Sequence, residues 1–406
     1  MESKNKVIIL IIFLALFFSI LAVNFSVASE RTVLNPDFVN ESIEEGNIHE
    51  SAYEEILLLL DDIAEEDEEI PEPLVETLKE SISPEIILEI ATTNVDTFYT
   101  YLDGETDDLV FELDLNQVRS NFNSDIESKF VESDISGIIE YLPTQNEDDF
   151  NDVIYEYNGT SYTISMIDNM LQDEASYDQT VNDYKNEIQA TDPSRDVYDI
   201  LDEILLEVKD EKTNLDEPIE EEFNKLLIIP LEHISKNSTY TEFIEEMDEQ
   251  RKTFSEEYSS IMFQEIVNEV PEEIEVDDEE LAHFDETKQY LQLTWLIIIG
   301  LVILIALLIY LLWFATKSVI VTTSIPGLAA LLSATSVIVI TLYASNLIDM
   351  MLTEVSEEIP ELGIQLVNVF STNILYVLQL QSIIIALIGV VLLGITVYYK
   401  KVKLNE

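Results

Sequence analysis

Four long stretches without a charged residue constrain what this chain can fold into. Each has at least the roughly 20 residues that a helix needs to cross the hydrocarbon core of a lipid bilayer. They contain no Asp, Glu, Lys, Arg or His, and they run from Val7 to Val27, Leu291 to Phe314, Val319 to Ala344 and Ile374 to Tyr399. The sequence therefore predicts a membrane protein with four spanning helices and the lipid bilayer as its first partner.

Basic residues beside these stretches predict their orientation, because Lys and Arg near spanning helices stay on the cytoplasmic side. With four crossings, six lysines near the ends of the stretches fall on one side of the membrane: Lys4, Lys6, Lys317, Lys400, Lys401 and Lys403. The opposite loop, residues 345–373, has no Lys or Arg and carries five acids. We therefore expect a multi-pass protein of the cell membrane with both termini in the cytoplasm and residues 29–290 outside it.

Aromatic residues near the ends of the stretches agree with this orientation, since Trp and Tyr favour the two membrane interfaces. The outer set is Trp295, Tyr343 and Tyr376, and the inner set is Tyr310, Trp313, Tyr398 and Tyr399.

The first stretch has a second interpretation, as a signal peptide. Ser26-Val27-Ala28 offers small side chains at the spacing that signal peptidase prefers. The apolar run is longer than a usual signal core, which favours an uncleaved signal anchor. Either outcome leaves the following segment outside the cytoplasm.

Acidic residues are concentrated in that segment. All but seven of the 82 acids and all but six of the 19 bases lie between residues 29 and 290. Because the acids are spread over every expected helix, adaptation to high salt is the favoured interpretation, and a patch for cations or a basic partner is the alternative. Such a surface repels phosphates, which argues against nucleic acid as a partner. The absence of cysteine excludes disulfides, thiolate metal sites and cysteine nucleophiles.

The acidic segment has mainly helical periodicity. An apolar stripe from Val197 to Val208 predicts a helix, which Asp192-Pro193 is expected to open. A similar stripe predicts a helix from Ser83-Pro84 to the residue before Gly104. Further helices are expected near residues 47–64, 116–140, 168–190, 218–229 and 241–269.

Two places in this segment have the alternating pattern of strands. Leu109 to Leu115 alternates apolar and acidic residues, and two short runs, 153–157 and 161–165, flank Asn158-Gly159, a pair favoured in tight hairpin turns. We expect a sheet of two or three short strands against helices. The acidic run from Glu272 to Glu280 is interpreted as a solvated neck above the membrane.

These patterns predict a mainly α protein with a small β element and a transmembrane helical bundle. We expect an N-terminal anchor or signal peptide in residues 1–28 and an acidic helical extracytoplasmic domain in residues 29–290. Residues 291–406 are expected to form three transmembrane helices with an amphipathic outer loop at residues 345–373.

Several short segments carry a resemblance: Leu34-Asn-Pro-Asp-Phe38, Ser83-Pro-Glu85, Tyr101-Leu-Asp-Gly-Glu-Thr-Asp-Asp-Leu109 and Phe111-Glu-Leu-Asp-Leu115. With the order of the spans, they resemble an uncharacterised family of prokaryotic membrane proteins that have an N-terminal span, a helical extracytoplasmic domain and C-terminal spans. The resemblance covers roughly the first third of the acidic segment. It implies this topology and no activity.

No catalytic motif or cofactor motif is present, so we expect no catalytic residues, no cofactor and no enzyme activity. His49, His233 and His283 are widely separated, and each is interpreted as a surface residue. The acidic run Asp103 to Asp108 is interpreted as a helix-ending turn at Gly104, with calcium binding as the alternative. Whether acid clusters hold a metal is left open.

The third stretch is rich in small residues from Thr322 to Ser336, which let helices approach closely in lipid. The fourth offers Ala386, Gly389, Val390 and Gly394 as a complementary surface. A packed bundle is favoured over a pore, because ionisable residues are absent from the spans.

Residues 345–373 are expected to form two short amphipathic helices, broken at Pro360, that dock under the extracytoplasmic domain or lie on the membrane.

The favoured function is that of an interaction, structural or sensing protein of the cell envelope, whose acidic domain meets an envelope protein or a glycan. A transporter or channel component is the alternative, and cysteine accessibility at Ser324, Ser333 and Ser336 would discriminate between the two. A membrane-anchored hydrolase that uses carboxylates or a metal is the second alternative.

Overall fold

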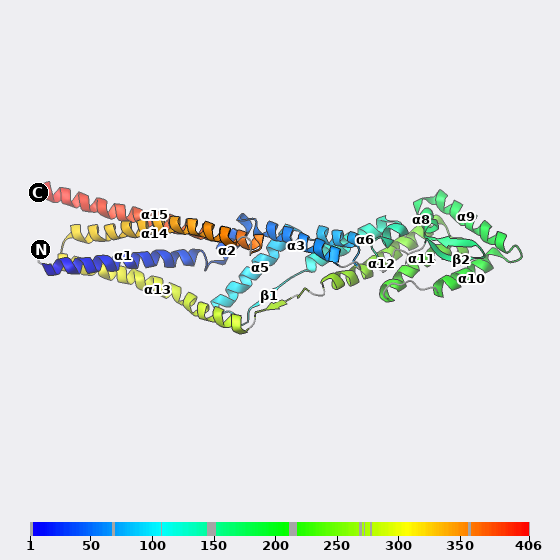
Figure 1. Cartoon of the computed structure of the whole chain (residues 1–406), viewed down its shortest axis with the longest axis horizontal. Helices are drawn as coiled ribbons and strands as arrows, with labels where there is room; N and C mark the ends of the chain where they lie inside the picture. Colours follow the sequence, from blue (N-terminus) through cyan, green and yellow to red (C-terminus); the bar gives the residue numbers. More distant parts are fainter. Residues whose placement is uncertain are drawn as a thin grey trace. The chain divides into compact units, whose positions relative to one another are not determined.

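The structure is a computed structural model that describes residues 3–66, 70–106, 108–143, 152–210, 217–267, 270–271, 273–276, 278–355 and 359–405. These residues form fifteen helices and four short strands (Figure 1), which confirms the mainly α class with a small β element. The chain divides into two compact units. The first unit comprises Met1–Ala52, Ile87–Leu113 and Glu273–Glu406, and the second comprises Tyr53–Ile86 and Asp114–Glu272.

Four long helices dominate the first unit: α1 (Ser3–Arg31), α13 (Asp278–Thr316), α14 (Val319–Val355) and α15 (Glu361–Asn405). Each contains a segment that is long and apolar enough to cross a membrane. These segments are Lys6–Arg31, Leu293–Thr316, Val319–Thr353 and Glu361–Val402. Helix α14 packs along α15, and α1 contacts the other three. The four helices therefore form one bundle, as a multi-pass membrane protein requires.

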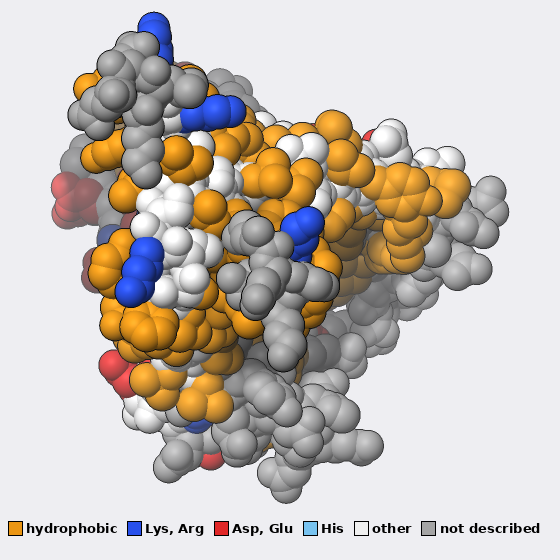
Figure 2. Space-filling model, turned by 90° about the vertical axis from the view of Figure 1, so that its left-hand side faces the viewer, with side chains coloured by type: hydrophobic (Ala, Val, Ile, Leu, Met, Phe, Trp, Pro, Cys, Tyr) orange, Lys and Arg blue, Asp and Glu red, His pale blue; other side chains and the backbone are white. Residues whose placement is uncertain are grey.

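One end of this bundle carries basic side chains. Both chain termini and the turn between α13 and α14 lie there (Figure 1). Figure 2 looks onto this end and shows Lys and Arg side chains standing among hydrophobic ones. The described lysines of these helix ends are Lys6, Lys317, Lys400 and Lys401. All seven aromatic residues assigned to interfaces are exposed on the bundle, as contact with lipid headgroups would require.

The segment expected to be an amphipathic outer loop extends the membrane helices instead. Helix α14 continues to Val355, and α15 begins at Glu361, directly after Pro360. The break at Pro360 is confirmed, but the expectation of two separate short helices is wrong. The apolar periodicity of each span continues into this segment, so α14 and α15 are longer than the apolar stretches from which they were predicted.

The beginning of α15 docks on α2 (Pro36–Glu45), which follows α1 in sequence. The Gln365 side chain donates a hydrogen bond to the Gly46 carbonyl at 3.0 Å, and Asn373 donates one to Ser42 Oγ at 3.1 Å. A Cβ atom on Gly46 would lie 2.7 Å from a Val369 methyl. This close contact agrees with the docking interpretation for this part of the segment.

A small two-stranded sheet completes the first unit. Strand β1 (Val110–Glu112) pairs antiparallel with β4 (Glu273–Glu275), and Phe111 lies opposite Ile274. Helix α5 (Pro84–Asp103) precedes β1 and ends before Gly104, whose φ of 78° only glycine adopts easily. Strand β4 lies inside the run interpreted as a solvated neck. Its residues Glu273 and Ile274 are exposed, as that interpretation requires, but the strand itself was not predicted. A three-residue strand has too little pattern to be recognised before its partner is known.

The second unit is a helical assembly with one hairpin. It contains the later part of α3 (Ile48–Glu66), the start of α5, and α4 (Glu72–Ser81), α6 (Asn116–Glu132), α7 (Ile135–Ile139), β2 (Val153–Tyr157), β3 (Thr160–Thr163), α8 (Ile164–Gln172), α9 (Glu174–Thr191), α10 (Val197–Asp210), α11 (Glu217–Lys236) and α12 (Tyr240–Val267). Helix α12 packs against both α6 and α11, so it is the central helix of this unit.

Aromatic side chains of α6, α11 and α12 fill the core of the second unit. Phe130 stacks on Phe254 with ring centroids 5.4 Å apart, and Phe223 and Tyr258 contact the same Phe254 ring. All four side chains are fully buried. Burying large aromatic rings is a major source of stability, which explains how a segment with so many acids folds.

Most helices and strands predicted from the sequence of this unit are present, but some of their boundaries differ. Asn158 and Gly159 adopt positive φ angles of 47° and 89° in the β2–β3 turn, so the predicted hairpin is confirmed. Helix α8 begins at Ile164, earlier than expected. The single helices expected at 116–140 and 168–190 are each two helices, broken where Asp134 and Asp173 cap a new N-terminus. Helix α10 starts at Val197, directly after Asp196. Asp192-Pro193, which was expected to open this helix, lies in a turn after α9 instead.

Candidate functional site

A layer of polar side chains lies inside the apolar bundle of the first unit. Asn24 of α1 and Ser382 of α15 are buried, and the Asn24 amide donates a hydrogen bond to Ser382 Oγ at 2.9 Å. Ser333 of α14 and Gln381 of α15 are also buried. We call these four residues the polar layer. None of them is ionisable, so the layer is neutral at any physiological pH.

The packing beside the polar layer shows that its members share one depth in the bundle. Ala28, Val337 and Leu378 form a buried cluster. Asn24 lies four residues before Ala28, and Ser333 lies four residues before Val337. Ser382 lies four residues after Leu378, on a helix that runs in the opposite direction. All three polar residues are therefore displaced from the cluster by about one helical turn in the same direction.

Several atoms of the polar layer have no hydrogen-bond partner among the described residues. They are Asn24 Oδ1, Ser333 Oγ, Gln381 Oε1 and Gln381 Nε2. An amide removed from water without a new partner costs free energy, and the cost is greater in a membrane because hydrocarbon offers no alternative partner. The layer thus presents both hydrogen-bond donors and acceptors that the protein itself leaves unused.

Towards the end of the bundle that carries the lysines, α14 and α15 approach closely. A Cβ atom on Gly389 would lie 2.9 Å from the Gly327 carbonyl oxygen. Thr323 and Thr396 share a hydrogen bond of 2.7 Å between the same helices. The predicted contact surface on the fourth span is therefore confirmed at Gly389. It is wrong at Gly394, where an added Cβ meets nothing within 4 Å among the described residues.

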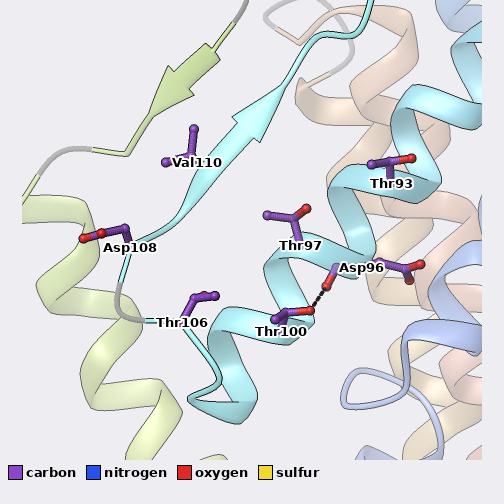
Figure 3. Close-up of a pocket in the computed structure, with 7 residues that line it drawn as sticks. All are labelled: Thr93, Asp96, Thr97, Thr100, Thr106, Asp108 and Val110. Atoms are coloured by element: carbon purple, nitrogen blue, oxygen red, sulfur yellow. Dashed lines mark hydrogen bonds between the residues drawn. The ribbon is translucent and has the colours of Figure 1, made fainter.

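A second candidate is a shallow groove of about 430 Å³ beside α5 in the first unit (Figure 3). It is lined by Thr93, Asp96, Thr97, Thr100, Thr106, Asp108 and Val110. The spacing of Thr93, Thr97 and Thr100 puts three hydroxyl groups along one face of the helix. Figure 3 shows Thr97 directed towards the segment that leads into β1, whereas the Thr100 hydroxyl donates a hydrogen bond back to the Asp96 carbonyl.

The groove has few features of a catalytic or metal-binding site. Both of its carboxylates are exposed, and Asp96 already accepts a hydrogen bond from Asn40 at 3.2 Å. Among the residues that the structure describes, no three His, Asp or Glu side chains could share a metal ion. The acidic run from Asp103 to Asp108 lies beside the groove. Helix α5 ends there before Gly104, as the interpretation of the run as a helix-ending turn requires. Asp107 of that run lies outside the described residues.

The three histidines do not come together in a site. His233 was expected at the surface, but it is buried, and its Nε2 atom lies 2.8 Å from a Glu246 carboxylate oxygen. The expectation was wrong because α11 turns this position towards the Phe243 ring of α12. His49 is partly buried in α3, and the side chain of His283 lies outside the described part of the structure.

One buried charge in the second unit was missed by sequence reasoning. Arg251 occupies a position on the apolar stripe of α12 and is 5% exposed. Its guanidinium donates a hydrogen bond to the Val131 carbonyl at 3.3 Å and lies 3.5 Å from Asp248. Burial lowers the pKa of Arg251, and nearby carboxylates oppose that shift. The guanidinium satisfies a carbonyl at the end of α6, so we interpret it as structural.

No family model, no curated protein and no solved structure matches this chain. The resemblance to a family of prokaryotic membrane proteins therefore stays a prediction, and arguments about function rest on the chain's own residues.

Proposed function

We propose that this chain is an envelope protein of the cell membrane that holds its acidic helical part outside the cytoplasm and interacts there with another envelope protein or a glycan. In this proposal the four helices anchor the chain, both termini are cytoplasmic, and α1 remains as an uncleaved anchor. The role is structural or sensory rather than catalytic.

The distribution of charge along the bundle carries the proposal. Lysines occupy the end with the two termini and the α13–α14 turn, where Lys317 lies (Figure 2). Residues 345–373, which include the other end of both α14 and α15, carry five acids, among them Asp349 and Glu361, and no base. Lysines favour the cytoplasmic side, so this asymmetry supports export of the segment between α1 and α13.

The contact between α2 and α15 supports a sensory role. Helix α2 belongs to the proposed extracytoplasmic part, and α15 belongs to the bundle. Gln365 and Asn373 fasten the two helices through hydrogen bonds. A change in the extracytoplasmic part that moved α2 would therefore act on a helix that crosses the membrane.

Site-specific photo-crosslinking in intact cells tests the proposed interaction. A photo-reactive residue replaces Leu206 of α10, which is 68% exposed, or Leu201 of the same helix, which is fully buried. The proposal expects discrete adducts with an envelope component from position 206 and none from position 201. Adducts at neither position, or equal adducts at both, would argue against a specific partner on this face.

The polar layer favours a transporter or channel component as the second candidate, because it places amide and hydroxyl groups in the membrane interior. A water-filled path along α14 should expose a cysteine at Ser324 or Ser336 to a membrane-impermeant thiol reagent. The packed-bundle interpretation expects no reaction at either position until the protein is denatured.

A hydrolase receives the least support. Its best candidate is the groove beside α5, whose carboxylates Asp96 and Asp108 are both exposed to solvent. A general acid of such an enzyme needs a raised pKa, and burial is the usual way to raise the pKa of a carboxyl group.

A further inference from the structure

Hydroxyl groups in this bundle are normally satisfied within their own helix. The side chains of Thr335, Ser336 and Thr341 donate to the carbonyls of Leu331, Leu332 and Ile338, respectively. Ser382 likewise donates to Leu378. Against this background the unpaired atoms of Asn24, Ser333 and Gln381 are exceptional, and they lie at one depth.

We propose that the polar layer is a binding site for water, and for other uncharged molecules of similar size that both donate and accept hydrogen bonds. Such a molecule would satisfy the side chains that the protein leaves unpaired. The site goes beyond the proposed function, since it concerns the interior of the bundle and holds for either orientation in the membrane.

The available atoms define the ligand. Asn24 uses its amide nitrogen on Ser382, so its free Oδ1 atom needs a donor. Gln381 has a free oxygen and a free nitrogen, so it needs one donor and one acceptor. A molecule that serves both residues must therefore carry both functions, as water does.

The surroundings select against ions. The apolar stretches that contain the layer, residues 7–27, 319–344 and 374–399, have no Asp, Glu, Lys, Arg or His. An ion at this depth would lack a neutralising charge, whereas a neutral molecule loses only its hydrogen bonds to water and regains them from the amides.

Thiol reactivity tests the site directly, because the natural chain has no cysteine and single-cysteine variants need no other change. Ser333→Cys puts a near-isosteric thiol into the layer. The neighbouring Ala334→Cys and Thr335→Cys variants are matched controls, since Ala334 is buried in the packed interface and Thr335 is exposed on the bundle surface. All three positions lie at nearly the same depth in α14.

The reagent is methyl methanethiosulfonate, which is small and uncharged and therefore enters both lipid and protein. It reacts with the thiolate, and a thiolate forms only where water reaches the sulfur. In the full chain in membranes, we expect the cysteine at position 333 to react at least about tenfold faster than those at 334 and 335. Equal, slow reaction at all three positions would overturn the proposal.

Gln381→Leu in the Ser333→Cys chain provides a second measurement. If Gln381 helps to hold water, its replacement by an apolar side chain of similar size should slow the reaction at position 333 by several-fold. An unchanged rate would remove Gln381 from the site. Should the Ser333→Cys chain fail to fold, Gln381→Cys against the same two controls tests the layer in the same way.

Discussion

Close packing between α14 and α15 depends on single glycines. Gly389 faces the Gly327 carbonyl oxygen at a distance that leaves no room for a Cβ atom. Gly389→Ala should lower the stability of the full chain in detergent by about 1–3 kcal/mol, since overpacking forces the helices apart. Gly394→Ala on the same helix is the control and should be neutral or slightly stabilising. Thermal unfolding followed by circular dichroism measures both, and equal effects would contradict the predicted contact.

Glu232 links two helices of the second unit and predicts a pH dependence. Its carboxylate lies 2.8 Å from both Lys209 and Lys236, and the bond from Lys209 is the main cause of its lowered pKa. A lowered pKa in the folded state means that this contribution is present above the ordinary pKa and is lost as pH falls through the lowered one.

Glu232→Gln should therefore cost about 0.5–1 kcal/mol at pH 7, a size typical of a partly exposed ion pair. The difference from the natural chain should shrink as pH falls from the ordinary glutamate pKa towards the lowered one, because the unfolded chain then binds a proton at this position before the folded chain does. Unfolding curves measured from pH 7 down to pH 3 check this. Glu249→Gln, at an exposed position of α12, is the control. A deficit that stays constant over this range would show that the ion pairs contribute little.

Sequence reasoning at this scale found the small residues of α14 and missed the polar layer. It searched the apolar stretches for ionisable residues, whereas Asn24 and Gln381 are neutral amides. Their presence was visible in the sequence, but their burial at one depth depends on how three helices pack. His233 and Arg251 were misjudged or missed for the same reason, since burial of a polar side chain is a tertiary property.

At the scale of elements, local chemistry predicted what needed only neighbours in sequence. The Asn158-Gly159 turn, the end of α5 at Gly104 and the apolar stripe of α10 are all present. Strand β4 was missed because its pairing with β1 joins residues more than 160 positions apart. The prediction of two separate outer helices was wrong. The sequence does not show whether an amphipathic segment continues a spanning helix or forms a helix of its own.

The α2–α15 contact gives a prediction at this scale. Gln365→Ala combined with Asn373→Ala removes both side-chain hydrogen bonds to the α2 region. Helix α2 contains Glu41, Glu44 and Glu45, so a protease that cleaves after glutamate should cut there several-fold faster in the double variant, because local opening exposes the backbone.

Thr372→Ala is the matched control for this double variant, because its hydroxyl donates a hydrogen bond within α15, to Asn368. The same cleavage rate in the double variant and the control would show that these bonds do not hold α2 in place. Mapping the fragments by mass spectrometry confirms that the cleavage occurs in α2.

At the scale of the molecule, charge repulsion predicts a dependence on salt. The formal net charge is −63, and Glu112 even faces Glu273 across the β1–β4 pair. Screening should reduce this repulsion, so the unfolding temperature should rise by roughly 5–10 °C between 0.05 and 2 M KCl. A parallel titration with choline chloride separates screening from specific binding of K⁺. A chain that is equally stable in dilute buffer would contradict the proposed adaptation to high salt.

Orientation in the membrane is the central claim, and labelling of intact cells tests it most directly. Asp202→Cys places a single thiol on an exposed position of α10, and Lys401→Cys places one at the lysine-bearing end of α15. A membrane-impermeant polyethylene glycol maleimide should label position 202 on intact cells and position 401 only after the cells are permeabilised. Labelling of position 401 on intact cells, with position 202 protected until lysis, would contradict the account.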